Sequence, residues 1–330
     1  MSDAPPRRRK PAWLKVKAPE PRQYRATVAL LDELGLHTVC REARCPNKGE
    51  CYASGTATFL ILGDVCTRGC RFCSVSHPDA ASAGDAAAST RAAAGLCAVD
   101  PDEPRRVAEA ARRLGLRHVV ITSVNRDDLP DGGASHFAAA VEAVREELPA
   151  ATFEVLIPDL GGDEAALGAV LAARPDVLSH NLETVPRLYA DVRPQAMYGR
   201  SLELLRRAAS WARGPAPARP LACGTANTDA PTRARTLVKS GLMVGLGETA
   251  DEVTVVLGDC AAAAVDLVTI GQYLQPCSGC LPVARFVAPA EFRELECRAA
   301  ALGLKVVAAP FARASYRAGE LLAREKDADA

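Results

Sequence analysis

Three closely spaced cysteines are the residues of this sequence best suited to chemistry. Cys66, Cys70 and Cys73 follow a C-x3-C-x2-C pattern, and Gly69 permits a tight wrap of the backbone between them. Three thiolates at this spacing can hold three corners of a four-iron cluster and leave the fourth iron without a protein ligand. That iron could chelate a cofactor through an amine and a carboxylate. The pattern therefore predicts a cofactor held against a one-electron donor.

A structural zinc site is the alternative for these three cysteines. Such a site needs four ligands and usually uses paired C-x2-C units. Only Cys70 and Cys73 form such a unit, so His77 would have to supply a further ligand. The three cysteines directly follow the apolar run Thr58–Leu62. A position after the end of a strand favours catalysis over a scaffolding role.

A second group of three cysteines precedes the first. Cys40, Cys45 and Cys51 have C-x4-C-x5-C spacing, and fourteen residues separate Cys51 from Cys66. Each group lacks a fourth ligand, so the sequence predicts two clusters in one chain. For the upstream group alone, a zinc knuckle or ordinary buried cysteines are the alternatives, and a cysteine further along the chain could complete it.

The composition favours metal or redox chemistry for the cysteines over disulfide bonding. The chain has 330 residues and 12 cysteines, and its 40 basic and 40 acidic side chains give zero net charge. A chain of this length buries a core without disulfides, and electroneutrality argues against binding nucleic acid by bulk electrostatics. No apolar stretch reaches the roughly 18 residues of a membrane span, and the N-terminus lacks a signal-peptide core. We expect a cytoplasmic protein with no membrane or nucleic-acid partner; the plastid or mitochondrial matrix is the alternative for a eukaryotic source.

The elements that must position the cysteines are short β-branched runs that alternate with helical patterns. This alternation predicts a parallel sheet with right-handed crossovers, and six units are too few for a closed eightfold barrel. We therefore predict an α/β fold, a partial (β/α)6 barrel. The expected strands are Thr58–Leu62, His118–Ser123, Thr152–Ile157, Asp176–His180, Leu237–Val244 and Leu267–Tyr273, and the expected helices are Pro104–Leu114, Ala134–Leu148, Asp163–Ala173, Ser201–Arg213, Ala250–Ala263 and Pro289–Leu302.

Two segments interrupt the alternation. Residues 78–100 are rich in Ala, Ser and Asp, and residues 214–235 are rich in Pro, Ala and Thr, so we interpret both as flexible insertions. The domain prediction is an N-terminal extension over residues 1–55, a barrel over 56–288 and a C-terminal extension over 289–330.

The two cysteine groups, together with later motifs, resemble the lipoyl synthase family of radical S-adenosylmethionine enzymes. The resemblance extends from about Lys10 to Ala318, apart from the two insertions, and the pairing of the two cysteine groups is highly specific. The later motifs are Ile121–Leu129 with Asp131–Ala134, Asn181–Tyr189, Lys239–Thr249 and Gly271–Pro276.

The resemblance implies a sulfurtransferase that inserts two sulfur atoms at C6 and C8 of a protein-bound octanoyl chain. The implied cofactors are two [4Fe–4S] clusters and S-adenosylmethionine. The implied partners are an octanoylated lipoyl carrier domain and an electron donor of the ferredoxin or flavodoxin type. The cluster that binds S-adenosylmethionine would be held by Cys66, Cys70 and Cys73, and the auxiliary cluster by Cys40, Cys45, Cys51 and Ser315.

The roles of the serine and of the cofactor contacts rest on less sequence information. Without the family, Ser315 would look like an ordinary exposed or capping serine. Arginine side chains at 193 and 313 could order a carboxylate, although exposed arginines are usually only solvated. The candidates for S-adenosylmethionine contacts lie at expected strand ends, where each could instead be a structural hydrogen-bonding residue: Ser123, Asn181, Glu183 and Glu248.

The sequence departs from the family pattern near its C-terminal end. Cys277 and Cys280 lie in a segment that is usually more basic and carries a histidine. Alanine also stands where the family tends to have Ser-Gly at 308–309 and Ser at 314. Two rival functions follow. Another sulfur-inserting radical enzyme would explain the downstream cysteines but not the upstream group with Ser315. A non-catalytic metal-binding derivative would not bind S-adenosylmethionine.

Overall fold

The computed structural model describes residues 9–16, 21–77, 96–214, 235–316, 318–320 and 322. Most of both expected insertions, residues 78–95 and 215–234, therefore lies outside the described residues. Among the described helices, none is long and apolar enough to cross a membrane.

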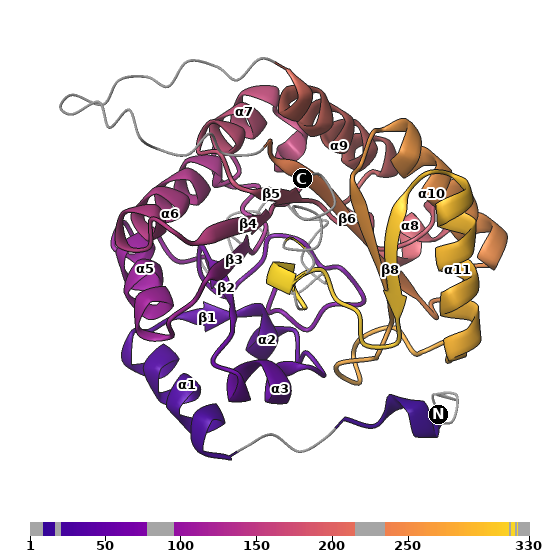
Figure 1. Cartoon of the computed structure of the whole chain (residues 1–330), viewed down its shortest axis with the longest axis horizontal. Coiled ribbons are helices and arrows are strands. Elements are labelled where there is room, and N and C mark those ends of the chain that lie inside the picture. Colours follow the sequence, from indigo (N-terminus) through magenta and orange to yellow (C-terminus); the bar gives the residue numbers. More distant parts are fainter. Residues whose placement is uncertain are drawn as a thin grey trace, which may run out of the picture.

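One eight-stranded sheet forms the centre of the molecule. The strands follow chain order from β1 to β8, and all neighbours pair in parallel except β1 and β2, which are antiparallel. The two edge strands do not pair with each other, so the sheet is an open arc (Figure 1). The strands are β1 (His37–Thr38), β2 (Thr58–Ile61), β3 (His118–Ser123), β4 (Thr152–Leu156), β5 (Val177–Ser179), β6 (Leu237–Val244), β7 (Leu267–Gln272) and β8 (Lys305–Ala309).

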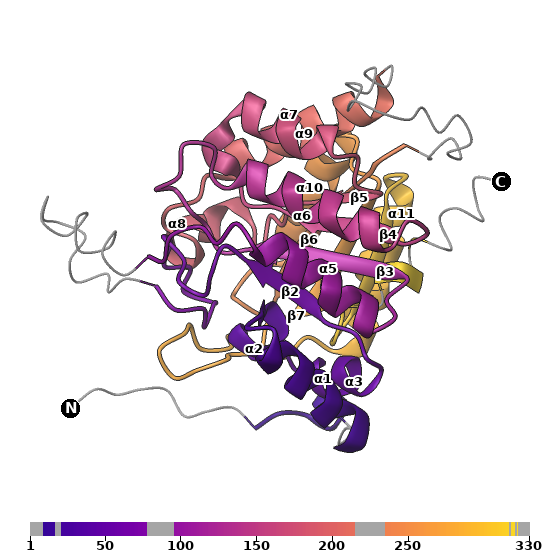
Figure 2. The same cartoon turned by 90° about the vertical axis from the view of Figure 1, so that its left-hand side faces the viewer.

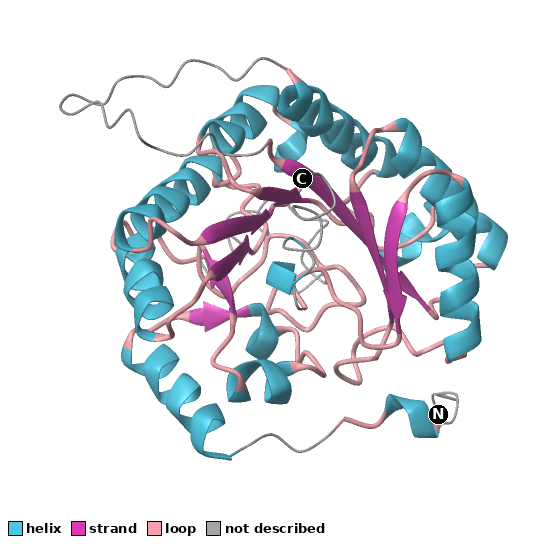
Figure 3. Cartoon of the chain, viewed as in Figure 1, coloured by secondary structure: helices cyan, strands magenta, loops and turns pink. Residues whose placement is uncertain are grey.

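The long helices lie outside the arc and cover its convex face (Figure 3). Each packs an apolar stripe against the sheet; Val107, Val141 and Leu205, from three different helices, are fully buried. This confirms the predicted partial barrel, and all six expected helices are present. They are α5 (Glu103–Arg113), α6 (Ala134–Glu147), α7 (Glu164–Ala172), α9 (Tyr198–Arg213), α10 (Ala250–Ala262) and α11 (Pro289–Ala301).

The sheet is larger than the six strands expected from the sequence. β8 extends it beyond β7, with Val306 opposite Val268, and the short strand β1 adds an antiparallel edge. Their weak signal explains the error, because β1 has only two residues and β8 is a short run with a lysine and two alanines. Several further elements were also not predicted: α1 (Pro21–Glu33), α2 (Val39–Glu42), α3 (Lys48–Ala53), α8 (Tyr189–Val192) and the 3-10 helices Ala12–Leu14, Leu160–Gly162 and Pro186–Leu188.

The segment after β8 turns back into the concave side of the arc, where Figure 1 shows it in yellow near the centre. Gly271 of β7 makes this possible, because a Cβ there would collide with the carbonyl oxygen of Ala312. Arg313 Nη2 donates a hydrogen bond to the carbonyl oxygen of Gln272 at 3.1 Å. Lys239 Nζ donates to the carbonyl oxygen of Ala314. The C-terminal segment is therefore fixed against β6 and β7.

Lys239 belongs to a buried ion pair inside the barrel. Its Nζ atom lies 3.1 Å from Glu154 Oε1, and His118 Nε2 lies 3.7 Å from Glu154 Oε2. Burial raises the pKa of Glu154, but the charge of Lys239 outweighs it and holds that pKa below its ordinary value. A buried pair of this kind adds little net stability, yet removal of either partner is costly because the other charge remains buried. In this protein the ion pair holds Lys239 Nζ in place as a hydrogen-bond donor to the C-terminal segment.

The burial of His180, directly after β5, should make the free energy of unfolding depend on pH. It is buried, with Nδ1 2.9 Å from the carbonyl oxygen of Ile157 and Nε2 2.9 Å from Ser201 Oγ, and burial lowers its pKa from 6.5 to about 4. Between these two values the unfolded chain binds a proton that the folded chain does not. The free energy of unfolding should therefore fall by up to about 1.4 kcal/mol for each pH unit between pH 6.5 and 4.

The measurement is denaturant unfolding at pH 7.5, 6.5 and 5.5 for the wild type and His180→Asn. Asparagine retains a donor near the position of Nδ1 but cannot titrate. The variant should be less stable at pH 7.5 and should lose less stability on acidification. Equal pH slopes in the two proteins would show that His180 is not the titrating group.

Candidate functional site

The downstream cysteines lie on the loop that directly follows β2. The Cys66 amide donates to the carbonyl oxygen of Ser76 at 2.8 Å, so the loop closes on itself. A Cβ at Gly69 would lie 3.0 Å from the His77 ring, which shows how closely that ring covers the backbone. The loop therefore wraps tightly, as the glycine suggested.

The donor set fits an iron–sulfur cluster better than a single metal ion. Within the described residues, no three His, Cys, Asp or Glu side chains converge so as to hold one metal ion. A four-iron cluster holds each thiolate on a different iron, so its thiolates need not converge on one point.

Backbone amides around the downstream cysteines point at their sulfur atoms. The amides of Arg68 and Asn125 donate to Cys66 Sγ at 3.4 and 3.3 Å, and the Val75 amide donates to Cys73 Sγ at 3.5 Å. Such N–H···S bonds stabilise negative charge on sulfur and tune cluster potentials. The loop is therefore arranged to receive thiolates.

Burial keeps these thiols protonated in the absence of a cation. It raises the pKa of Cys73 to about 12, with smaller contributions from the charges of Cys70, Cys66 and Glu183. Burial also raises the pKa of Cys70, while the Arg193 guanidinium opposes that increase. Ionised thiols in such surroundings need a bound cation, which iron supplies. The three thiols belong to one short loop, and the charge of Glu183 acts on both Cys70 and Cys73.

Arg68, between the first two cysteines of this loop, anchors it to the neighbouring strands. Its guanidinium is buried and donates to both Asp127 carboxylate oxygens at 2.8 and 2.6 Å and to Asp159 Oδ1 at 2.7 Å. Asp127 follows β3 and Asp159 follows β4. Arg68 was not among the residues predicted from the sequence, although its position between two cluster cysteines was an available signal. The loop is thereby fixed to the C-terminal ends of two further strands.

Asn181 and Glu183 lie on the segment directly after β5, and the charge of Glu183 acts on Cys70 and Cys73. Glu183 has a left-handed backbone, with φ 67°, which costs about 1–2 kcal/mol for a residue with a side chain. Backbone bonds from the Glu183 amide to Gly241 and from the Met243 amide to Glu183 enforce that conformation. Strain of this kind persists where surrounding contacts over-determine it, often at functional sites.

Two of the expected cofactor contacts have buried polar atoms without a protein partner. Asn181 Nδ2 donates to Glu183 Oε1 at 3.1 Å, but Asn181 Oδ1 has no hydrogen-bond partner. Ser123 Oγ, at the end of β3, also has none. A buried polar atom without a partner is costly, and a bound ligand would remove that cost. These residues therefore fit a polar cofactor.

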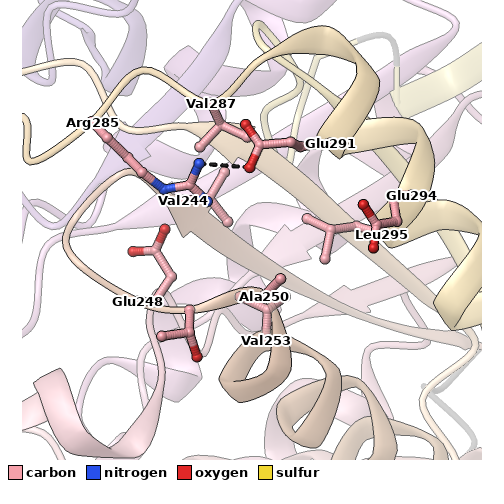
Figure 4. Close-up of a pocket in the computed structure, with 10 residues that line it drawn as sticks. Val244, Glu248, Ala250, Val253, Arg285, Val287, Glu291, Glu294 and Leu295 are labelled. Atoms are coloured by element: carbon pink, nitrogen blue, oxygen red, sulfur yellow. Dashed lines mark hydrogen bonds and ion pairs between the residues drawn. The ribbon is translucent and has the colours of Figure 1, made fainter.

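Glu248 lies in different surroundings from the other three expected contacts. Its carboxylate accepts hydrogen bonds from the amides of Gly245 at 2.5 Å and Leu246 at 2.9 Å. Both oxygens are thus used within its own turn. Figure 4 shows Glu248 beside the pocket between the end of β6 and helices α10 and α11, where Arg285 pairs with Glu291 at 2.6 Å.

Arg193 supports the backbone of the Asn181–Glu183 segment. Its Nη1 atom donates to the carbonyl oxygens of Asn181 at 2.9 Å and Leu182 at 3.2 Å. Its guanidinium also lies 5.5 Å from the centre of the Tyr189 ring. Arg193 is thus not the solvated side chain that its residue type suggested. It fixes the segment that carries Glu183.

The upstream cysteines lie on and between α2 and α3. Burial raises the pKa of Cys40 to about 11 and that of Cys51 to about 12, and the nearby Cys45 adds to both increases. As at the downstream group, these surroundings favour thiolates only with a bound cation.

The C-terminal segment contacts the upstream cysteine segment on both sides of Ser315. Asn47 Nδ2 donates to the carbonyl oxygen of Phe311 at 2.8 Å, and Tyr316 Oη donates to Glu50 Oε1 at 2.8 Å. Asn47 and Glu50 both lie between Cys45 and Cys51. Residues more than 260 positions apart in sequence are therefore joined around the position of the serine.

Arg313 connects the surroundings of the two cysteine groups. Burial lowers the pKa of its guanidinium, whereas the charges of Cys45 and Glu183 raise it. One of these residues belongs to the upstream group and the other lies beside the downstream group. The C-terminal segment thus supplies a buried cation whose charge interacts with Cys45 and with Glu183.

The sequence comparisons identify the family of this chain. Residues 60–210 match the radical SAM superfamily, and residues 2–45 match the N-terminal domain of lipoyl synthase of that family. Lipoyl synthase of Nitratidesulfovibrio vulgaris strain Hildenborough is 49% identical over 314 residues, which cover 95% of this chain and 92% of the relative. Lipoyl synthase of Chlorobium chlorochromatii is 48% identical, with 96% and 95% covered. A solved structure, Streptococcus suis SuiB bound to S-adenosylmethionine, aligns with a TM-score of 0.49 and 11% identity over 86% of this chain and 53% of that one.

An open parallel barrel with a three-cysteine loop after its first parallel strand, together with the superfamily match, defines a radical S-adenosylmethionine enzyme. Within that class, the chain belongs to the lipoyl synthase family. It is therefore a sulfur-inserting enzyme of the sulfurtransferase class, and its cofactors are S-adenosylmethionine and two [4Fe–4S] clusters. The resemblance found in the sequence is confirmed.

The anchoring role of Arg68 predicts a large stability effect. Arg68→Gln leaves the buried Asp159 carboxylate with its longer guanidinium contact to Arg200 Nη1 at 3.5 Å, so the free energy of unfolding should fall by about 2 kcal/mol. Arg71→Gln is the matched control in the same loop, because its side chain is exposed and, among the described residues, donates only to the Asp191 carbonyl oxygen at 3.3 Å. Its effect should stay within about 0.5 kcal/mol. Denaturant unfolding followed by circular dichroism measures both, and equal effects would contradict the anchoring role.

Proposed function

We propose that this enzyme inserts sulfur at C6 and C8 of an octanoyl chain attached to a lysine of a lipoyl carrier domain. The main support is the joining of the C-terminal segment to the upstream cysteine segment through Asn47–Phe311 and Glu50–Tyr316. A radical enzyme that only cleaves S-adenosylmethionine needs the downstream loop but not this second arrangement. The arrangement therefore favours an enzyme that carries a dedicated sulfur source.

The assignment of ligands follows from the two groups of buried thiols. The N–H···S bonds and the closed loop support the downstream cysteines as ligands of the cluster that binds S-adenosylmethionine. When bound, S-adenosylmethionine and the clusters supply the hydrogen-abstracting radical and the sulfur atoms. The proposed ligands are Cys66, Cys70 and Cys73 for the first cluster and Cys40, Cys45, Cys51 and Ser315 for the auxiliary cluster.

Ser315 is suited to be the replaceable ligand of its set. A hydroxyl is a poorer ligand for iron than a thiolate, so one corner of the auxiliary cluster would open first. The contacts on either side of Ser315 come from backbone and neighbouring side chains. The serine segment would therefore stay in place when the hydroxyl leaves the iron.

The cofactor contacts that we propose are Ser123, Asn181 and Glu183. The unpartnered Ser123 Oγ and Asn181 Oδ1 suit the hydroxyl and amine groups of S-adenosylmethionine. Glu248 was expected to join them, but its two carboxylate oxygens already accept backbone bonds. For Glu248 we propose the indirect role of holding the turn after β6.

The proposed partners are an octanoylated lipoyl carrier domain and an external electron donor of the ferredoxin or flavodoxin type. The curated relatives are bacterial, and exposed reduced cysteines such as Cys97 and Cys297 suit a reducing compartment. We therefore propose the cytoplasm as the location.

Ser315→Ala tests the auxiliary ligand. We expect near-normal folding and S-adenosylmethionine cleavage, with at least a tenfold loss of lipoyl product, because sulfur release requires the replaceable ligand. The assay is anaerobic, uses an octanoylated carrier peptide and reads the product by mass. Ser135→Ala, an exposed serine on α6, is the control and should behave as the wild type. Unchanged lipoyl product in Ser315→Ala would refute the assigned role.

A pair of cysteine variants separates the two clusters. Cys70→Ala should abolish S-adenosylmethionine cleavage, because it removes a ligand of the cluster that binds that cofactor. Cys45→Ala should retain cleavage and lose sulfur insertion. Iron and acid-labile sulfide counts should fall from two clusters to one in each variant. Loss of S-adenosylmethionine cleavage in both variants would contradict the division of labour, and one zinc with no sulfide in the wild type would exclude the enzyme.

A further inference from the structure

The loop between β7 and α11 carries two cysteines that the proposed function does not use. Cys277 and Cys280 have C-x2-C spacing, and their Sγ atoms lie 3.0 Å apart as free thiols. A disulfide bond between these two side chains would need only a small movement. Neither residue belongs to the two groups of proposed cluster ligands.

The two thiols differ in access to solvent. Cys277 is partly exposed, beside the exposed residues Ser278 and Gly279, whereas Cys280 is only 7% exposed. In Figure 2 this loop is the orange segment that extends past α2. An accessible thiol can attack a dissolved disulfide, and a buried neighbour can then resolve the mixed disulfide. The pair has the asymmetry that such exchange requires.

The buried cysteine contacts the loop of the downstream cysteines. Cys280 Sγ donates to the carbonyl oxygen of Cys73 at 3.3 Å. The next residue, Leu281, donates its amide to the carbonyl oxygen of Arg71 at 2.8 Å and accepts from Tyr273 Oη at 2.7 Å. A change at Cys280 is therefore transmitted directly to the backbone of Cys73.

The same loop also reaches the upstream cysteine segment. Arg44, next to Cys45, donates from Nη1 to the carbonyl oxygen of Pro276 at 3.4 Å. The residue before Cys277 is thus bonded to one cysteine segment, and Cys280 is bonded to the other. The C-x2-C pair therefore lies between the two segments, which are also joined directly where Ser74 Oγ donates to the carbonyl oxygen of Glu42 at 2.7 Å.

We propose that Cys277 and Cys280 form a reversible dithiol–disulfide site that reacts with small-molecule disulfides and weakens the support of the Cys66–Cys73 loop when oxidised. The loss of support follows from chemistry, because a disulfide sulfur carries no hydrogen and cannot donate to the Cys73 carbonyl oxygen. The effect on catalysis rests on the proposed function, whereas disulfide formation itself does not.

The reaction is a thiol–disulfide exchange in two steps. The Cys277 thiolate attacks one sulfur of a small disulfide RSSR, so that a mixed disulfide forms and one RS⁻ leaves. The Cys280 thiolate then attacks the Cys277 sulfur and displaces the second RS⁻. The two protein thiols lose two electrons and two protons, and RSSR becomes two RSH. A small thiol reverses both steps.

The test uses cluster-loaded wild type and Cys277→Ser in anaerobic buffers with graded ratios of reduced to oxidised glutathione. Acid quenching, alkylation and mass analysis count free thiols in the peptide that contains both cysteines. Cys277→Ser cannot form the disulfide but retains the Cys280 donor to Cys73. Cys297→Ser is the control, because Cys297 is exposed on α11. Iron content and S-adenosylmethionine cleavage are measured on the same samples.

In wild type and Cys297→Ser we expect the two thiols to disappear together as oxidised glutathione increases and to return with dithiothreitol. S-adenosylmethionine cleavage should fall at least threefold and recover in parallel, whereas Cys277→Ser should not respond. The proposal would be overturned if the Cys277 and Cys280 thiols were lost independently of each other. It would also be overturned if S-adenosylmethionine cleavage did not change when the disulfide forms. Thiol masking released only by a chelator would overturn it as well, because that would indicate a bound metal. If the reduced enzyme makes no lipoyl product yet cleavage follows the disulfide, the proposed function fails and this inference stands.

Discussion

The cost of burying ionised sulfur is the constraint on which the rest of this structure depends. Burial raises the pKa of Cys40, Cys51 and Cys73 to between about 11 and 12, so thiolates are stable there only with a bound cation and nearby donors. The loop after β2 meets this demand with backbone amides aimed at sulfur. Its closure and its arginine anchor hold those amides in place. Cluster assembly and folding of the loop are therefore expected to be coupled.

The open barrel provides the space in which two cysteine groups can meet one C-terminal segment. Because β1 and β8 do not pair, the concave side of the sheet admits the chain after β8. The buried Lys239–Glu154 pair and the glycine at 271 fix where that chain passes. A closed barrel would fill its interior with side chains and leave no room for this segment.

Most of the barrel could be predicted because parallel strands buried on both faces appear as continuous apolar runs. Phe59, Ile121 and Val268, from three such strands, are fully buried. The strands β1 and β8 could not be predicted from the sequence. β1 has only two residues, and β8 contains a lysine and two alanines, so neither shows a clear apolar pattern. The contacts of the C-terminal segment carry no periodic signal, and in that segment the sequence indicated a functional role only for Arg313 and, through family resemblance, for Ser315.

The sequence by itself determined the two groups of cysteines and predicted their chemistry, because the cysteines within each group lie within a dozen residues and local spacing governs them. Tertiary structure alone decided which distant groups meet. The partners of Arg68, the joining of Asn47 to Phe311 and the contact of Cys280 with Cys73 each link separate parts of the chain. Such contacts depend on the packing of the whole barrel, which no short-range pattern encodes.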